Sequence, residues 1–183
     1  SYIAFRHISN ARLGFGYVWN PPPFRPVEGY TSFLWVLVLD VVWRVSGVEP
    51  PDAAYAIALL CAALTLALGA RMVWRMRLPA VLEPYRPGLL ALVLLGVLTN
   101  RTFLAWTSSG LETARFNLIF TVWLYACAFL DHRRTANRAA LVGAAALLAL
   151  TRPDGLLFLA VTLTYGAVLW WLDGGRRAGV GAH

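Results

Sequence analysis

The sequence contains no lysine, only two cysteines and few charged side chains. Charged residues make up 14% of its 183 positions, whereas hydrophobic residues make up 59%. A soluble domain needs about a quarter of its residues charged to cover its surface. The shortage of charge therefore argues against an ordinary soluble domain and favours an all-α protein that crosses a lipid bilayer several times.

Cysteine chemistry and a secretion signal are also missing. Cys61 and Cys127 lie inside apolar runs, where cysteine behaves as a small hydrophobic residue, so we expect no disulfide and no cysteine metal site. The sequence begins at Ser1 without methionine, inside an expected helix, and shows no signal-peptide pattern. We expect a fragment whose parent protein extends beyond both ends.

The net charge of +7 comes from sixteen arginines. Such a charge could indicate nucleic-acid binding, but the sequence shows no stripe of basic residues on a helix or domain that would face water. We therefore expect no nucleic-acid partner. Cytoplasmic loops of membrane proteins collect arginine, which explains the same excess.

Five apolar segments follow a polar N-terminal region, and we expect them to form a bundle of about five transmembrane helices. Helices of 17 or 18 residues span about 26 Å, enough for a thin hydrocarbon core. The fourth segment has only 13 residues and precedes Arg-Pro-Asp-Gly, so we expect it to stop short and open a polar cavity. The five segments are 53–70, 88–105, 114–130, 139–151 and 156–172.

The distribution of arginine sets the expected orientation. Nine arginines lie in or beside the first and third connections and after the fifth segment, against one in each of the other two connections. The positive-inside rule then puts residues 173–183 in the cytoplasm and residues 1–52 on the outer face, with juxtamembrane helices. The nine are Arg71, Arg75, Arg77, Arg86, Arg133, Arg134, Arg138, Arg176 and Arg177.

The apolar stretch 31–47 is expected to lie in the outer interface and not to span. Asp40 and Arg44 stand four residues apart, which suits an exposed pair and is costly in lipid. Trp35 and Trp43 would then sit at headgroup level. A short tilted or re-entrant span remains an alternative.

Polar stretches gather on the predicted outer face. Each has a structural and a functional interpretation: Glu28 could be a solvated loop carboxylate, Ser32 a helix cap, and Glu112 a charge favoured at a helix N-terminus. His7 has no partner at metal-ligand spacing and is expected to be an interfacial side chain. Arg152 and Asp154 lie between two apolar segments, where they form a structural salt bridge or a site that binds phosphate.

Four motifs carry a family resemblance. GYVWNP, EGYTSFLW, SGLET and RPDG occur in this order within residues 1–165. Together they resemble the polytopic GT-C glycosyltransferases, in particular the group containing the mycobacterial terminal β-(1→2) arabinofuranosyltransferases and their mannosyltransferase-like relatives. The resemblance implies a GT-C-like helical bundle in the plasma membrane, with its active face outside. It also implies transfer of arabinofuranose or mannose from a polyprenyl-phosphate carrier to a glycan acceptor of the cell envelope.

The resemblance also implies roles for particular residues. Arg152, and second Arg6, would bind the donor phosphate. The catalytic carboxylates of such families precede a stretch like SYIAFR, so the general base is expected upstream of Ser1. Some members use a divalent cation, but the scattered carboxylates do not establish one here, and no metal ligand is assigned. The residues expected to contact sugar or acceptor are Trp19, Asn20, Glu28, Gly29, Tyr30, Thr31, Ser32, Ser109, Glu112 and Asp154.

Two other classes of protein remain open. A transporter or flippase of lipid-linked material would also need polar residues in an apolar scaffold, and it predicts related repeats with broken helices. A non-catalytic subunit of a cell-envelope assembly is the third class.

Overall fold

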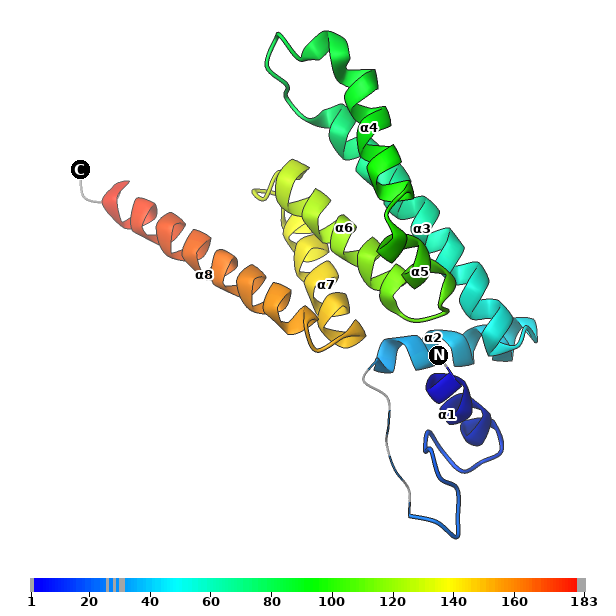
Figure 1. Ribbon diagram of the computed structural model, residues 1–183. Helices are drawn as coiled ribbons and strands as arrows, with labels where there is room; N and C mark the ends of the chain where they lie inside the picture. Colours follow the sequence, from blue (N-terminus) through cyan, green and yellow to red (C-terminus); the bar gives the residue numbers. More distant parts are fainter. Residues whose placement is uncertain (1, 26, 28, 30–31, 181–183) are drawn as a thin grey trace.

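The protein is built from helices alone over the residues that the computed structural model describes, which are 2–25, 27, 29 and 32–180 (Figure 1). The predicted all-α class is confirmed. The elements are α1 (Tyr2–Arg12), α2 (Phe33–Ser46), α3 (Pro50–Arg75), the 3₁₀ turn η1 (Glu83–Tyr85), α4 (Arg86–Leu98), α5 (Arg101–Ser108), α6 (Thr113–Phe129), α7 (Thr135–Thr151) and α8 (Gly155–Val180).

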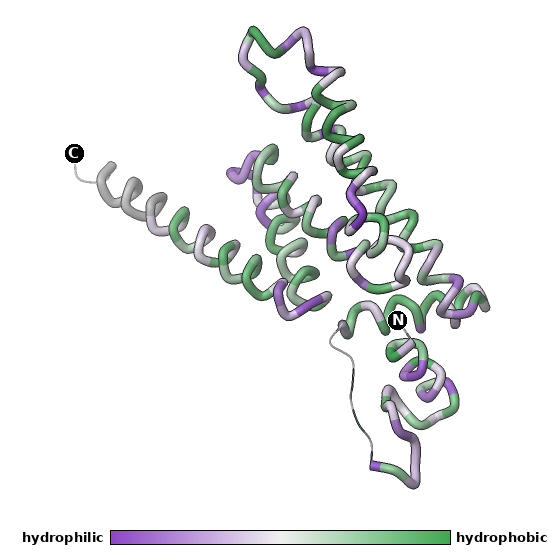
Figure 2. The backbone as a smooth tube through the Cα atoms, viewed as in Figure 1, coloured by the Kyte–Doolittle hydropathy of each residue, from purple (hydrophilic) through white to green (hydrophobic). Residues whose placement is uncertain are grey.

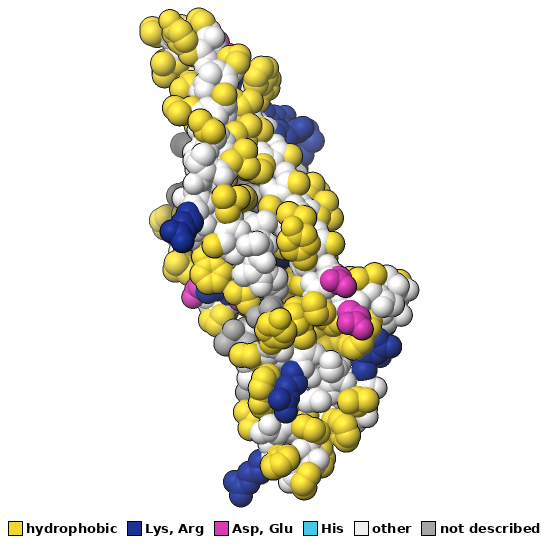
Figure 3. Space-filling view, turned by 45° about the vertical axis from the view of Figure 1, so that its right-hand side comes forward, with side chains coloured by type: hydrophobic (Ala, Val, Ile, Leu, Met, Phe, Trp, Pro, Cys, Tyr) yellow, Lys and Arg dark blue, Asp and Glu magenta, His cyan; other side chains and the backbone are white. Residues whose placement is uncertain are grey.

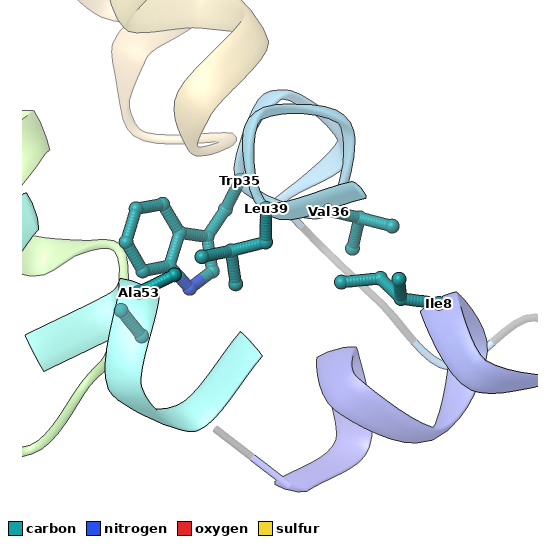
Figure 4. Packing of buried hydrophobic residues seen from close by; sticks show 6 residues of the cluster. Ile8, Trp35, Val36, Leu39 and Ala53 are labelled. Carbon is teal, nitrogen blue, oxygen red and sulfur yellow. The ribbon is translucent and has the colours of Figure 1, made fainter. Parts of the chain in front are cut away.

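Helices α1 and α2 form a unit that packs across one end of the longer helices. α2 contacts α1, α3 and α7 (Figure 1). Its core contains Ile8 of α1, Trp35 and Leu39 of α2, and Ala53 of α3 (Figure 4). Trp35, expected at headgroup level, is only 2% exposed, because its position on α2 faces α3. That expectation is therefore wrong.

Asp40 and Arg44 do form the predicted pair, but not as an exposed one. Arg44 Nε donates to Asp40 Oδ2 at 2.9 Å, and the Tyr17 hydroxyl donates to the same oxygen at 2.5 Å. The Asp40 side chain is 4% exposed. The loop after α1 folds back and covers it, a long-range contact that the local i,i+4 spacing does not reveal.

The longer helices pack through small side chains. α3 contacts α6, α6 contacts α7, and α7 contacts α8. The residues buried between them are mostly alanine, as in Ala58, Ala114, Ala126 and Ala145. Small residues let helix backbones approach closely, which is how helices associate where burial of large side chains is not the driving force.

We had expected the segment 88–105 to form one continuous helix, but the structure breaks it into two. α4 ends at Leu98, α5 begins at Arg101, and the two are bent by 57°. Asn100 starts the new helix, since its side chain accepts a hydrogen bond from the Phe103 N–H at 3.0 Å. Asparagine is a favoured N-cap residue, and here that local preference interrupts an otherwise apolar run.

Other helix limits also differ from the expected segments. α3 has 26 residues and extends beyond 53–70 at both ends. α7 begins at Thr135, so it has 17 residues and not 13. α8 continues through Val180, so the proposed cytoplasmic end, 173–183, is largely helical.

One described helix, α3, is long and apolar enough to cross a membrane, and the bent α4–α5 pair would be a second if it forms one span. α6, α7 and residues 155–171 of α8 are shorter apolar helices. Hydrophobic residues dominate α3, α4 and the coloured part of α8 (Figure 2), and hydrophobic side chains cover much of the face seen in Figure 3. A bundle of about five spans therefore stays a prediction.

Candidate functional site

Three segments that are distant in the sequence meet at one end of the bundle. Arg152, in the α7–α8 turn, reaches Glu112 at the start of α6, with Nη1 3.5 Å from Oε1. Arg115, in the first turn of α6, donates from Nη1 to the Leu34 carbonyl of α2 at 2.9 Å. Glu112 of SGLET and Arg152 of RPDG thus form one polar cluster, and Arg115, two residues after SGLET, connects the SFLW segment to α6 beside it.

The α7–α8 turn holds Arg152 between two carboxylates. Besides Glu112, its Nη2 lies 3.2 Å from Asp154 Oδ2. The side chain of Arg152 is 36% exposed, that of Glu112 16% and that of Asp154 70%, so the cluster opens to the surface. Arg152 ends α7 with extended backbone. The close return of the chain requires Gly155, because a Cβ there would overlap the backbone of Leu148.

Arg115 is the residue that our sequence analysis missed. Only 8% of it is exposed, and its guanidinium carbon lies 5.2 Å from the centre of the Trp35 ring. Its Nε and Nη2 atoms are buried without a hydrogen-bond partner. We had counted it inside the apolar segment 114–130. An arginine inside a predicted span is itself a signal of a functional site and could have identified it.

Arg6 is not brought to Arg152 by any contact that the structure gives. Its Nε donates to the Trp19 carbonyl at 3.0 Å, and its guanidinium carbon lies 4.4 Å from the Trp19 ring centre. Asn10 donates to the same carbonyl at 3.2 Å. Arg6 and Trp19 therefore hold the loop after α1 against that helix, on the side of α2 away from the bundle (Figure 1).

His7 is buried and not interfacial, which corrects our expectation. It is fully covered, and its Nδ1 lies 2.7 Å from the Ile3 carbonyl. The Gly29 N–H donates to His7 Nε2 at 3.4 Å. Gly29 is thus placed beside α1. Of the neighbouring predicted residues, Glu28, Tyr30 and Thr31 lie outside the described residues.

The remaining predicted residues have mixed placements. Ser32 is the N-cap residue of α2, but its side chain makes no capping hydrogen bond, and its Oγ is buried without a partner. Ser109 Oγ donates to the Trp106 carbonyl at 2.9 Å and so stabilises the turn before Glu112. Asn20 is partly exposed.

Cavities lie between helices in the described part of the chain. One of about 440 Å³ lies between α3 and α5, and another of about 260 Å³ lies among α6, α7 and α8. Ligand sites typically enclose about 300–1,000 Å³, a range that includes the first cavity. It is lined by Tyr55, Leu59, Arg101, Leu104, Ala105, Thr107 and Ser108.

The described part of the chain holds no group of three or more histidine, cysteine, aspartate or glutamate side chains that could bind a metal ion. Comparison of the whole chain with protein-family models, curated proteins and solved structures finds no match. The family resemblance therefore rests on the sequence motifs.

Proposed function

We propose that the protein is a membrane glycosyltransferase that moves a sugar from a polyprenyl-phosphate carrier to a glycan acceptor of the cell envelope. The donor sugar would be of the arabinofuranose or mannose class, and the reaction would take place at the outer face of the plasma membrane. The observation that supports the proposal most is the ion pair between Glu112 of SGLET and Arg152 of RPDG at one end of an apolar bundle, where Arg115 also bonds the SFLW segment.

In the proposed reaction a general base removes the proton of the acceptor hydroxyl. The hydroxyl oxygen attacks the anomeric carbon, and the lipid phosphate leaves with the bonding electron pair. We assign this base to none of the described residues. Arg152 would stabilise the charge that develops on the leaving phosphate, because a guanidinium matches two phosphate oxygens. Glu112 and Asp154 would hold Arg152 and orient sugar hydroxyls.

A transporter of lipid-linked material is a second candidate. The break between α4 and α5 favours it, since interrupted helices are common at transporter binding sites. A transporter would move the lipid-linked sugar across the membrane without forming a new glycosidic bond.

The test is a radiolabel transfer assay in membranes that contain the natural full-length protein, supplied in parallel with polyprenyl-phosphate arabinofuranose and polyprenyl-phosphate mannose. We expect sugar transfer from one of the two donors. In Arg152→Ala the rate of transfer should fall by about a hundredfold or more. Arg138→Ala, at an exposed position early in α7, is the matched control and should retain activity. Absence of transfer by folded protein would contradict the proposal, and translocation of intact donor would support the transporter.

A further inference from the structure

We propose that Arg115, Ser32 and the N-terminal end of α2 form a phosphate-binding site that takes the phosphate of a membrane lipid. The lipid source rests on the proposed function, whereas the phosphate chemistry rests on the side chains alone. This site is separate from Arg152, whose guanidinium already has two carboxylate neighbours.

The first argument is the unsatisfied state of Arg115. A guanidinium has five N–H donors, and burying a cation is costly unless its donors are matched. Among the described residues Arg115 has one hydrogen-bond acceptor, the Leu34 carbonyl, and its Nε and Nη2 have none. With 8% exposure, the side chain is also shielded from water. Acceptor oxygens supplied by a ligand would satisfy these donors.

The second argument is the charge around Arg115. Among the described residues the Glu112 carboxylate acts electrostatically on Arg115, but no ion pair within 4 Å joins the two, and Glu112 pairs with Arg152. The other close groups are the Trp35 ring and the buried Cys61, neither of which is an anion when the thiol is protonated. An anion at Arg115 would therefore add a direct counter-charge, where only the more distant Glu112 now acts.

The third argument is the element at which Arg115 points. Its Nη1 reaches the first turn of α2, a helix of 14 residues whose N-cap Ser32 makes no capping bond. Ser32 is 6% exposed, and its Oγ has no partner. A helix N-terminus carries partial positive charge and favours anions. The buried guanidinium and the free hydroxyl thus lie at the first turn of α2, whose partial positive charge also suits a phosphate group.

A lipid is the favoured source because the site lies where apolar helices meet. α6 provides Arg115 and continues as an apolar helix to Phe129. Large exposed hydrophobic side chains lie on the neighbouring helices, among them Leu59 and Leu147. A hydrocarbon chain attached to the phosphate could follow such faces, which an inorganic ion would not use.

The test measures binding by calorimetry to the purified protein in phosphate-free dodecyl maltoside micelles. The probes are farnesyl phosphate, farnesol and inorganic phosphate, none of which contains a sugar. The variants are Arg115→Met and Arg138→Met, the latter removing an exposed arginine early in α7. We expect farnesyl phosphate, but not farnesol, to bind the wild type and Arg138→Met, and to bind Arg115→Met roughly tenfold to a hundredfold more weakly.

Several results are decisive. Equal binding of inorganic and farnesyl phosphate, lost in Arg115→Met, would support the phosphate site and overturn its lipid source. No binding by the wild type, or unchanged binding by Arg115→Met, would overturn the site itself. Arg115→Met should fold without ligand, since an apolar side chain replaces a buried, poorly matched charge.

Should Arg115→Met not fold, Ser32→Ala decides: weaker binding of farnesyl phosphate supports the site, and unchanged binding overturns it. Because no transfer reaction is measured, absence of glycosyl transfer in the separate assay leaves this result intact.

Discussion

The N-terminal unit of α1, the following loop and α2 differs from the bundle α3–α8 in what each buries. In the unit, large side chains such as Ile8, Trp35 and Leu39 are buried, and long polar side chains have partners. In the bundle, the buried residues are mostly alanine, while large residues such as Trp170 and Leu157 are exposed. The two regions therefore differ in the side chains that form their interiors, whereas both also expose large hydrophobic residues, such as Val45 in the unit.

The difference shows where each region obtains its stability. The unit depends on a mixed apolar and polar interior, as soluble proteins do. The bundle depends on close backbone contact through small residues and exposes an apolar surface, which is the arrangement expected of helices surrounded by lipid. The candidate site lies at the junction, where α2 meets α6 and α7.

The largest expected effect is that of Trp35→Ala. The indole is 2% exposed and packs on Leu39 and Ala53, so its removal leaves a cavity and should reduce the free energy of unfolding by about 3–5 kcal/mol. Chemical unfolding in mixed micelles measures this change. Trp170→Ala, at 79% exposure, is the matched control and should change it by less than about 1 kcal/mol. Equal losses would remove the contrast between the regions.

Much of the helical fold could be predicted from the sequence, because long apolar runs bounded by proline, glycine and charge define helices. The break at Thr99 and Asn100 could not be predicted in this way, because hydropathy is summed over a window of residues and a single capping residue barely changes the summed hydropathy. The burial of the Trp35 side chain could not be predicted either. An amphipathic helix has an apolar face, but the sequence does not say whether protein or lipid covers it.

The candidate site was predicted only in part. The count of arginines in the loops predicted that the SGLET and RPDG motifs lie on one face. It did not predict the contact between Arg152 and Glu112, because that contact depends on how α6 packs on α7. Arg115 was missed because one charged residue lowers the mean hydropathy of a long apolar segment only slightly. Arg6 bonds Trp19, and the sequence did not indicate this contact because it forms only where the loop after α1 turns back on the helix.

A smaller effect is expected from Tyr17, which tests whether the unit behaves as a buried polar interior. Burial raises the pKa of the Tyr17 hydroxyl above its usual value of 10.0, and the hydrogen bond to Asp40 raises it further. Folding therefore favours the protonated phenol. Its contribution is complete below the unfolded pKa and is lost as pH rises through the higher folded pKa.

Tyr17→Phe should accordingly lower the free energy of unfolding by about 1–3 kcal/mol at neutral pH and should reduce its decline above about pH 10. Thermal unfolding between about pH 8 and pH 11 measures both effects, and Tyr85→Phe, at 65% exposure, is the control. An alkaline decline identical to that of the wild type would show that Tyr17 is not protected by the fold.

The smallest expected effect on stability is that of Asp154→Asn, at the edge of the candidate site. The Asp154 side chain is 70% exposed, so its ion pair with Arg152 is screened by water and should contribute less than about 0.5 kcal/mol. Glu112→Gln is the sharper comparison, because that side chain is 16% exposed and pairs with the same guanidinium. Chemical unfolding of both variants should show the larger loss for Glu112→Gln. A larger loss for Asp154→Asn would mean that the α7–α8 turn, and not its contact with α6, holds Arg152 in place.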